Sequence, residues 1–266
     1  MNIKASIHLV NKYFSLWGVN LKTLFLSIKS IPRFIKDYKN IKSQIHTNNS
    51  PFPIKPNYPV LNEFDENAGV AKGHYFHQDL LIAQKIFEAN PKIHFDVGSR
   101  IDGFVAHVAS FRKIKTLDIR PLKSASKNIE FEQGDLMCLN DELTEVCDSL
   151  SCLHALEHFG LGRYNDKIDA DGHIKGFDSL TKMLKPEGTL YISIPIGPQR
   201  IEFNAHRVFS VEYLINIFQK KFTVETFSYV DDHGNLHLNQ LLEESAIRNN
   251  YGCNYGCGIF ELKKLH

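Results

Sequence analysis

The sequence lacks a long uncharged apolar run, a cysteine framework and any low-complexity tract. Lys22 and Lys29 interrupt the best candidate for a membrane-spanning helix, which needs about 18 apolar residues in succession. Lys12 and His8 interrupt what would be the apolar part of a secretory signal. The five cysteines are an odd number without paired ligand spacing, so we expect neither a disulfide framework nor a zinc ribbon. These absences predict a cytoplasmic protein that is soluble or peripheral at the inner membrane surface.

The charge is distributed unevenly along the 266 residues, although the net charge is only +1. Residues 1–50 contain eight Lys and Arg residues against Asp37 alone, so the remaining chain has 31 − 8 = 23 basic and 30 − 1 = 29 acidic residues. A mildly acidic body, whose aromatic residues are spaced as core residues, predicts no nucleic-acid partner.

The basic N-terminal segment has apolar residues at helical spacing, with lysines between them. A proline-rich stretch, "TNNSPFPIKPNYPV", follows it. We therefore predict a basic amphipathic helical arm over 1–46, bent or broken near Pro32, a linker over 47–72 and one domain over 73–266. The arm could contact a membrane surface, a partner protein or its own body through residues 3–35. The apolar stripe consists of Ile3, Ile7, Val10, Phe14, Trp17, Leu21, Leu24, Ile28, Ile31 and Ile35.

Beyond residue 74, segments typical of helices alternate with segments typical of strands. This order predicts an α/β fold with a mostly parallel seven-stranded sheet and helices on both faces. The expected helices cover 75–91, 104–111, 174–188 and 210–222, and the expected strands lie within 93–99, 114–120, 129–136, 147–156, 189–197, 223–230 and 258–265.

A glycine-containing turn, "FDVGSRIDGF", follows the first expected strand. Gly98 and Gly103 permit a tight turn and a close ligand approach, and Asp118 ends the next strand about twenty residues later, where a carboxylate can accept hydrogen bonds from ribose hydroxyls. On its own, the turn could also be structural, with Asp118 a surface residue.

The segment "HALEHFGLG" places His154, Glu157 and His158 close together. H-x-x-E-H is the spelling of inverted zinc peptidases, but that site needs a long helix. A strand precedes this segment, and Gly160 and Gly162 end any helix after one turn, so we predict no metal site. His154, His158 and His206 are instead candidates for a general base, and a hydrogen-bonded structural imidazole is the alternative for each.

A third polar segment, "GPQRIEFNAHRVFS", follows the fifth expected strand. Such a loop lies on the rim where a parallel sheet binds ligands, although an ion pair between Arg207 and Glu202 could merely fix it. The predicted acceptor-binding residues are Arg163, Tyr164, Arg200, Asn204, His206 and Arg207.

The segments "DVG", "LDI", "GDL", "HALEH" and "LKPEGTLYISIP" together resemble class I S-adenosylmethionine-dependent methyltransferases over about residues 75 to 262. More narrowly, "GHYFHQDLLIAQKIFEANP" and "SLSCLHALEHFGLGRYND" are similar to the bacterial domain-of-unknown-function 268 family, methyltransferase-like proteins found among surface-polysaccharide genes. The resemblance implies a Rossmann-like methyltransferase fold with S-adenosylmethionine as cofactor. The implied cofactor-binding residues are Asp96, Gly98, Ser99, Arg100, Gly103, Asp118, Ile119, Asp135, Leu136 and His154.

One part of this sequence departs from the family pattern D-x-G-x-G-x-G. The stretch from Asp96 to Gly103 lacks the middle glycine and has a longer spacing, and Arg100 could pair with Asp102 or meet the cofactor carboxylate. The expected function is methyl transfer to a hydroxyl of a sugar or glycan precursor. A noncatalytic scaffold in a glycan-assembly complex and another group transfer on an activated sugar are the alternatives.

Overall fold

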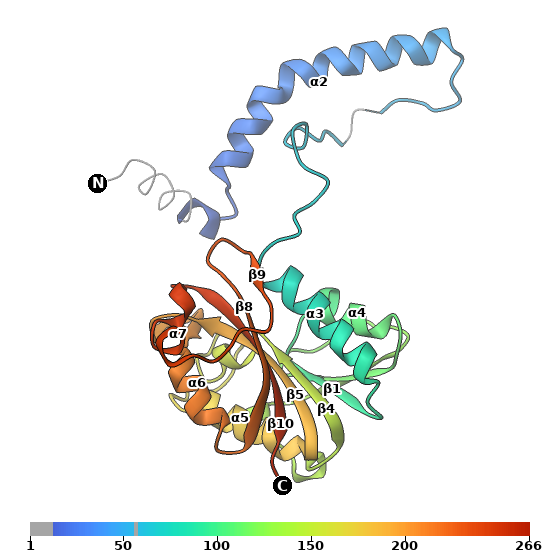
Figure 1. The fold of residues 1–266 in the computed structure, drawn as a ribbon. Helices are drawn as coiled ribbons and strands as arrows, with labels where there is room; N and C mark the ends of the chain where they lie inside the picture. The colour runs from blue at the N-terminus through green and yellow to red at the C-terminus, as the bar shows by residue number, and fades with distance from the viewer. Residues whose placement is uncertain (1–12, 56–57) are drawn as a thin grey trace. The chain divides into compact units, whose positions relative to one another are not determined.

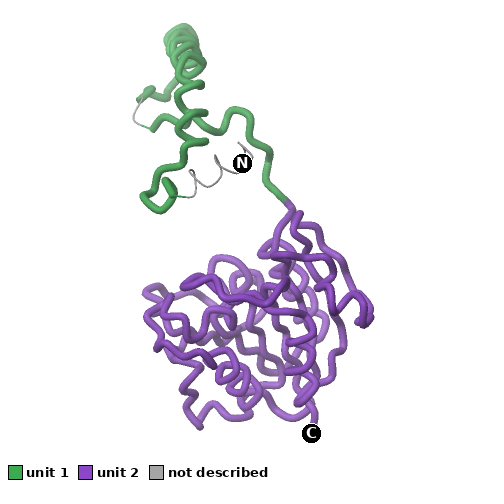
Figure 2. Tube along the Cα trace, turned by 90° about the vertical axis from the view of Figure 1, so that its left-hand side faces the viewer, with its two compact units in different colours: residues 1–70 green, residues 71–266 purple. Residues whose placement is uncertain are grey.

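The computed structural model describes residues 13–55 and 58–266, which form two compact units. Unit 1 is Met1–Val70 and unit 2 is Ala71–His266 (Figure 2). The boundary falls near the end of the linker predicted over 47–72.

Unit 1 is built around one long helix, α2 (Leu21–Thr47). The Asn20 side chain accepts a hydrogen bond from the Thr23 amide (3.1 Å) and so caps its first turn. The helix continues through Pro32, and Figure 1 shows it bending along its length, as expected where proline removes a backbone hydrogen bond. Part of the apolar stripe, from Ile3 to Val10, lies outside the described residues.

Unit 2 contains an eight-stranded sheet with the order β3-β2-β1-β4-β5-β10-β8-β9. The pairs from β3 to β5 are parallel, and the pairs β5-β10, β10-β8 and β8-β9 are antiparallel. The strands are β1 (His94–Val97), β2 (Ile114–Asp118), β3 (Ile129–Gln133), β4 (Cys147–Leu153), β5 (Leu184–Ile196), β8 (Phe222–Val230), β9 (Leu236–His237) and β10 (Gly256–Lys264).

The predicted α/β class and mostly parallel sheet are confirmed, with eight strands where we expected seven. The additional strand, β9, has two residues and pairs with β8, where His237 stacks on Tyr229 with ring centroids 4.5 Å apart. A strand of two residues is too short to show alternating hydrophobicity, which explains why the sequence did not reveal it.

Helices cover both faces of the sheet, as predicted (Figure 1). One buried cluster includes side chains of α3 (His74–Ala89) and α4 (Ala106–Ala109); a larger one includes those of α5 (Gly172–Met183) and α6 (Val211–Phe218). Shorter elements are α7 (Glu244–Arg248), a separate hairpin of β6 (Arg200–Glu202) and β7 (His206–Val208), and single turns at Ile101–Val105, Leu136–Cys138, Asp141–Leu143, Leu156–His158 and Asn250–Gly252.

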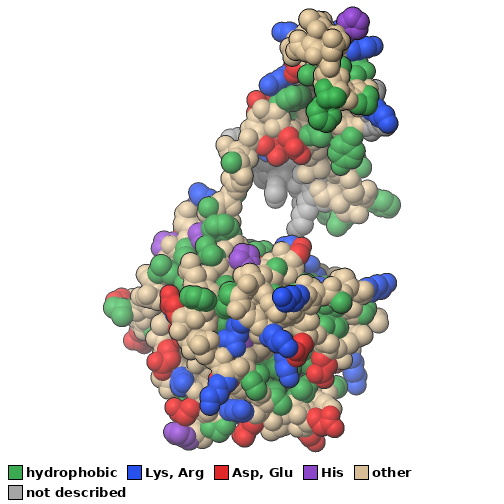
Figure 3. Space-filling view, turned by 90° about the vertical axis from the view of Figure 1, so that its right-hand side faces the viewer, with side chains coloured by type: hydrophobic (Ala, Val, Ile, Leu, Met, Phe, Trp, Pro, Cys, Tyr) green, Lys and Arg blue, Asp and Glu red, His purple; other side chains and the backbone are tan. Residues whose placement is uncertain are grey.

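The surface of unit 2 carries charges of both signs. On the face drawn in Figure 3, basic and acidic side chains are interspersed over this unit. Among the described residues, no helix is both long and apolar enough to cross a membrane.

Candidate functional site

A pocket of about 830 Å³ opens where the parallel strands end. Residues that follow β1, β2, β3 and β4 line it, together with Tyr75, His206 and Tyr255. The strand order reverses next to β1, because β2 lies on one side of it and β4 on the other. In open α/β sheets, ligands bind in the crevice at such a switch point.

Gly98 forms the turn that leaves β1. Its φ of +72° lies in the left-handed region, and a Cβ atom built on it would lie 2.8 Å from the Ala155 Cβ atom. Its amide donates to the Leu117 carbonyl (2.9 Å). A side chain is therefore excluded on both conformational and steric grounds, and the turn lies directly against the loop that follows β4.

Asp96 does not line the pocket, contrary to its predicted place in the cofactor site. It is fully buried, and one oxygen accepts from the hydroxyls of Ser99 and Ser151, both at 2.6 Å. Burial raises its pKa to about 7, although these hydrogen bonds oppose the shift. Asp96 therefore fixes the turn from behind, while Ser99 lines the pocket.

The stretched part of the loop closes on itself. Arg100 forms two hydrogen bonds to Asp102, at 3.1 and 3.0 Å, which matches the first of the two expected arrangements. Gly103 is not a lining residue; a Cβ atom there would lie 2.7 Å from a carboxylate oxygen of the buried Asp79 on α3, which would have to shift to admit a side chain. Gly103 was predicted to bind the cofactor, but it packs against α3 and does not contribute to the pocket wall.

Asp118, the last residue of β2, is held by Arg120. Its two oxygens accept from the guanidinium at 3.0 and 2.6 Å, and one also accepts from the Arg120 amide at 2.8 Å. The Arg120 guanidinium in turn lies 4.5 Å from the centroid of the Tyr164 ring. Because Tyr164 belongs to the loop after β4, this chain of contacts crosses the pocket. A ribose hydroxyl that binds Asp118 must share or displace Arg120.

The loop after β3 supplies a third wall. Asp135 uses one carboxylate oxygen to accept from the Met137 amide (2.9 Å) and so caps the short turn Leu136–Cys138. Asp135, Leu136 and Met137 line the pocket beside Ile119, which follows β2. Ile119, Asp135 and Leu136, which the resemblance implied as cofactor-binding residues, thus all line the pocket.

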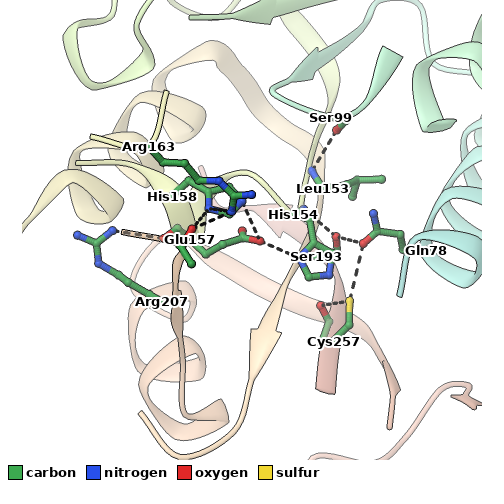
Figure 4. A network of polar contacts seen from close by, with 12 residues as sticks. Gln78, Ser99, Leu153, His154, Glu157, His158, Arg163, Ser193, Arg207 and Cys257 are labelled. Atoms are coloured by element: carbon green, nitrogen blue, oxygen red, sulfur yellow. Dashed lines mark hydrogen bonds and ion pairs between the residues drawn. The ribbon is translucent and has the colours of Figure 1, made fainter. Parts of the chain in front are cut away.

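His154 follows β4 in a left-handed conformation, with φ of +50°. Only a single turn, Leu156–His158, comes after it, so His154 and His158 do not share a helical face and the zinc-peptidase arrangement is absent from this segment. The Glu157 carboxylate instead accepts from His154 Nδ1 at 2.7 Å, between side chains that are 1% and 4% exposed (Figure 4). Burial lowers the pKa of His154, but Cys257 and Glu157 outweigh it and raise that pKa well above 6.5.

His158 and His206 also line the pocket. His158 Nδ1 lies 2.7 Å from the Ala205 carbonyl, to which it donates, and Nε2 lies 3.7 Å from the Glu157 carboxylate. Burial lowers the pKa of His158 and of His206. The remaining nitrogen of His158 is thus an unprotonated acceptor near neutral pH.

Several predicted acceptor-binding residues lie elsewhere. Arg207 is 4% exposed and donates to the carbonyls of Phe159 and Ala170, so it fixes the loop after β4 from inside (Figure 4). Arg200 bonds to Glu202 and to the carbonyl of Asn254. Arg200, Asn204 and Arg207 are not lining residues, whereas the other three, Arg163, Tyr164 and His206, are. The expected ion pair of the loop joins Glu202 to Arg200 and not to Arg207.

Sequence reasoning missed several lining residues. Arg120 follows Asp118 by two positions, so an Asp-x-Arg spacing at a strand end was the available signal. Tyr75 and Tyr255 gave none, because they come from the start of α3 and from just before β10, far apart in the chain.

The comparisons with solved structures define the fold as that of S-adenosylmethionine-dependent methyltransferases. The chain is similar to the [4+2]-cyclase SpnF (14% identity, TM-score 0.51, covering 74% of this chain and 88% of that one). It is also similar to the 1,6-didemethyltoxoflavin-N1-methyltransferase of Burkholderia thailandensis, solved with S-adenosylhomocysteine (15% identity, TM-score 0.50, 81% and 99% covered). Among curated proteins, none matches this sequence.

The family model described as "Caenorhabditis protein of unknown function, DUF268" matches residues 114–251, more than half of the chain, and the chain belongs to this family. The family number is the expected one. Its description names Caenorhabditis where we expected bacteria, and says nothing of polysaccharides, so that part of the expectation stays a prediction.

Proposed function

We propose that unit 2 is a methyltransferase that uses S-adenosylmethionine to methylate a hydroxyl of a sugar or glycan precursor in surface-polysaccharide biosynthesis. The observation that carries the proposal is the pocket itself. It gathers the Gly98 turn, Asp118 and Asp135 from the ends of three strands, in a fold shared with an enzyme solved with S-adenosylhomocysteine. The bound cofactor would supply an electrophilic methyl group.

The lining residues fit such a cofactor. Gly98 permits close approach to the turn after β1, and Asp118 offers carboxylate oxygens to two ribose hydroxyls once Arg120 moves aside. Asp135 keeps one carboxylate oxygen that does not cap Met137 and could accept from an adenine amino group.

His158 is the residue best placed to accept the proton of the acceptor hydroxyl. Its Nδ1 is committed to the Ala205 carbonyl, so Nε2 receives the proton, and the Glu157 carboxylate 3.7 Å away stabilises the imidazolium that forms. The protein otherwise needs only to align the hydroxyl with the methyl group. His154 is less suited, because Glu157 occupies its Nδ1 and its Nε2 faces away from this acceptor region toward Cys257 (Figure 4).

A hydroxylated acceptor is favoured by the wall opposite the proposed cofactor site. There Arg163, Tyr164, His206 and Tyr255 present hydrogen-bonding groups from the loop after β4, from the start of β7 and from just before β10. The Asp166 carboxylate also lines the pocket but accepts from backbone amides of its own loop. Sugars and their phosphates are recognised by such mixed donors and acceptors. The family resemblance supplies the polysaccharide context.

The test is calorimetric titration of the full chain with S-adenosylmethionine and S-adenosylhomocysteine. We expect micromolar binding, about −8 kcal/mol, that Asp118→Ala weakens at least about tenfold. Glu130→Ala is the matched control, since Glu130 is an exposed carboxylate on the neighbouring strand β3. Equal affinity of Asp118→Ala and wild type would exclude the ribose assignment, and no heat with either ligand would exclude the cofactor.

A second candidate, a scaffold of the same fold or an enzyme with other chemistry, is favoured by one observation. Asp118 forms an ion pair with Arg120, and Arg100 forms one with Asp102. Asp118 and Arg100, which were predicted to bind the cofactor, are therefore each already paired with a neighbouring side chain. The SpnF cyclase belongs to the same fold. Cofactor binding in the titration would argue against the scaffold, and transfer of a labelled methyl group to a nucleotide-linked sugar would argue against other chemistry.

We further propose that the arm binds an anionic membrane surface. In α2 the side chains of Leu24, Ile28, Ile31 and Ile35 are 42 to 59% exposed, and lysines occupy intervening positions. An apolar stripe with a basic opposite face suits the boundary between acyl chains and anionic headgroups.

A further inference from the structure

Three side chains with metal-binding chemistry converge at the edge of the pocket: His74, His154 and Cys257. One potential ligand atom of each lies within 4.8 Å of the others. They come from the first residue of α3, from the loop after β4 and from the second residue of β10. Because β10 runs antiparallel to β5, its first residues lie at the edge where β4 ends.

His154 has the orientation that a metal ligand requires. Its Nδ1 donates to the Glu157 carboxylate (2.7 Å), so Nε2 is the nitrogen available to a metal, which would displace its proton. That nitrogen is buried, and among the described residues its polar neighbour is the Cys257 thiol, which does not form a hydrogen bond of ordinary geometry with it. A histidine that ligates a metal almost always donates its other ring nitrogen to a carboxylate, carbonyl or water in this way. A buried imidazole nitrogen without a partner otherwise requires an explanation.

The other two ligands are positioned as well. The His74 ring stacks on His154, with centroids 5.2 Å apart and planes 6° apart, and His74 also bonds to the backbone of Tyr255. Cys257 is fully buried, and its thiol lies 3.8 Å from the Gln78 side-chain oxygen, which the Ser193 hydroxyl also contacts at 2.6 Å. Figure 4 shows Cys257 and Gln78 beside the His154 ring.

We propose that His74, His154 and Cys257 bind a zinc ion, a site that does not depend on the proposed methyl transfer. Two imidazoles and a thiolate suit Zn²⁺, whereas Mg²⁺ and Ca²⁺ prefer oxygen ligands. Bonds of about 2.0 to 2.3 Å would place the ligand atoms roughly 3.3 to 3.8 Å apart. The ligand atoms, which lie within 4.8 Å of one another, would come to that spacing through rotation of the His74 and Cys257 side chains on metal binding. The Cys257 proton leaves when the metal binds.

The zinc ion would keep one open coordination position. Three protein ligands leave a fourth place for water or an incoming oxygen, as in catalytic zinc sites. His74 and His154 both line a second pocket of about 450 Å³, and His154 also lines the main pocket. The ion would thus lie between the two pockets.

A cysteine nucleophile activated by His154 and Glu157 would use the same residues. That arrangement needs the sulphur to meet a substrate, but Cys257 is 0% exposed and lines neither pocket. Metal ligation needs no such access, because the ion can enter past His74, which is half-buried at the second pocket.

The experiment is metal titration of the full chain, with Zn²⁺ followed by elemental analysis and with Co²⁺ followed by absorbance. We expect about one zinc per chain and a thiolate-to-cobalt charge-transfer band in the near ultraviolet. Cys257→Ser should abolish the band, and Cys253→Ser, which changes a buried cysteine of the same segment outside the cluster, should keep it.

The histidines are tested by a second matched pair on one helix. His74→Asn should weaken Zn²⁺ binding at least about tenfold, whereas His77→Asn, one turn further along α3, should not. This pair decides the outcome if Cys257→Ser does not fold. Zinc well below one per chain, or a cobalt band that survives Cys257→Ser, would overturn the proposal. So would equal affinities of the two histidine variants. None of these readouts requires S-adenosylmethionine or an acceptor.

Discussion

At the scale of single residues, His158 sets an expected pH dependence. Burial lowers its pKa from the ordinary 6.5, so the neutral base persists below that pH and is lost as the pH falls through the lowered value. The acidic limb of kcat/KM for methyl transfer, which reports the free enzyme, should therefore lie below pH 6.5. A profile between about pH 5 and 8 measures it.

His158→Asn tests this assignment, and His206→Asn is its matched control. The first should lower kcat about 100-fold or more and remove the limb, whereas the second should retain the limb. An acidic limb at or above pH 6.5 in the wild type, or one that survives His158→Asn, would exclude His158 as the base.

Single residues also show how far the sequence could anticipate the site. The sequence predicted Gly98, Asp118 and His154 as cofactor-binding residues, and all three line the pocket, because each directly follows or ends a strand and parallel strands end at one edge. The meeting of His74 with Cys257 could not be foreseen. It depends on the antiparallel entry of β10 beside the parallel strands, which no local spacing reports.

At the scale of elements, Arg207 joins β7 to the loop after β4. Its buried guanidinium donates to the Phe159 and Ala170 carbonyls, and Lys cannot reproduce this fork of donors. Arg207→Lys should lower the free energy of unfolding by about 2 to 4 kcal/mol, as measured by urea denaturation.

Arg200→Lys is the control for this prediction, since Arg200 is partly exposed on the neighbouring strand β6. It should cost about 1 kcal/mol or less. If Arg207→Lys kept full stability but raised the KM for the acceptor, the original prediction of a substrate-binding arginine would be correct after all.

The element scale explains why Arg207 was misjudged from the sequence. "RIEFNAHRVF" gathers polar groups on one segment, but its residues alternate in a hairpin, so His206 lines the pocket while Arg207 points into the protein. The helix expected over 174–188 ends at Met183 instead. Residues 184–188 join β5, where Leu184 is buried.

At the scale of the whole molecule, the two compact units should separate in function. We expect residues 71–266 alone to fold with a thermal midpoint within about 4 °C of the full chain and to bind the cofactor with the same affinity, because the pocket is built from unit 2 alone. A large loss of stability or affinity in the truncated chain would contradict this.

The same truncation tests the arm. The full chain should sediment with vesicles of phosphatidylglycerol but not phosphatidylcholine, and residues 71–266 with neither, because the apolar stripe and lysines belong to unit 1.

Leu24→Ser with Ile28→Ser should weaken binding, since each apolar side chain contributes about 1.5 to 3 kcal/mol when buried. The matched control, Ser27→Ala with Ser30→Ala, leaves the stripe intact and should bind like the wild type. Salt should also weaken binding, since headgroup attraction is screened. If neither the two serine substitutions in the stripe nor added salt weakened vesicle binding of the full chain, the arm would be excluded as the membrane contact.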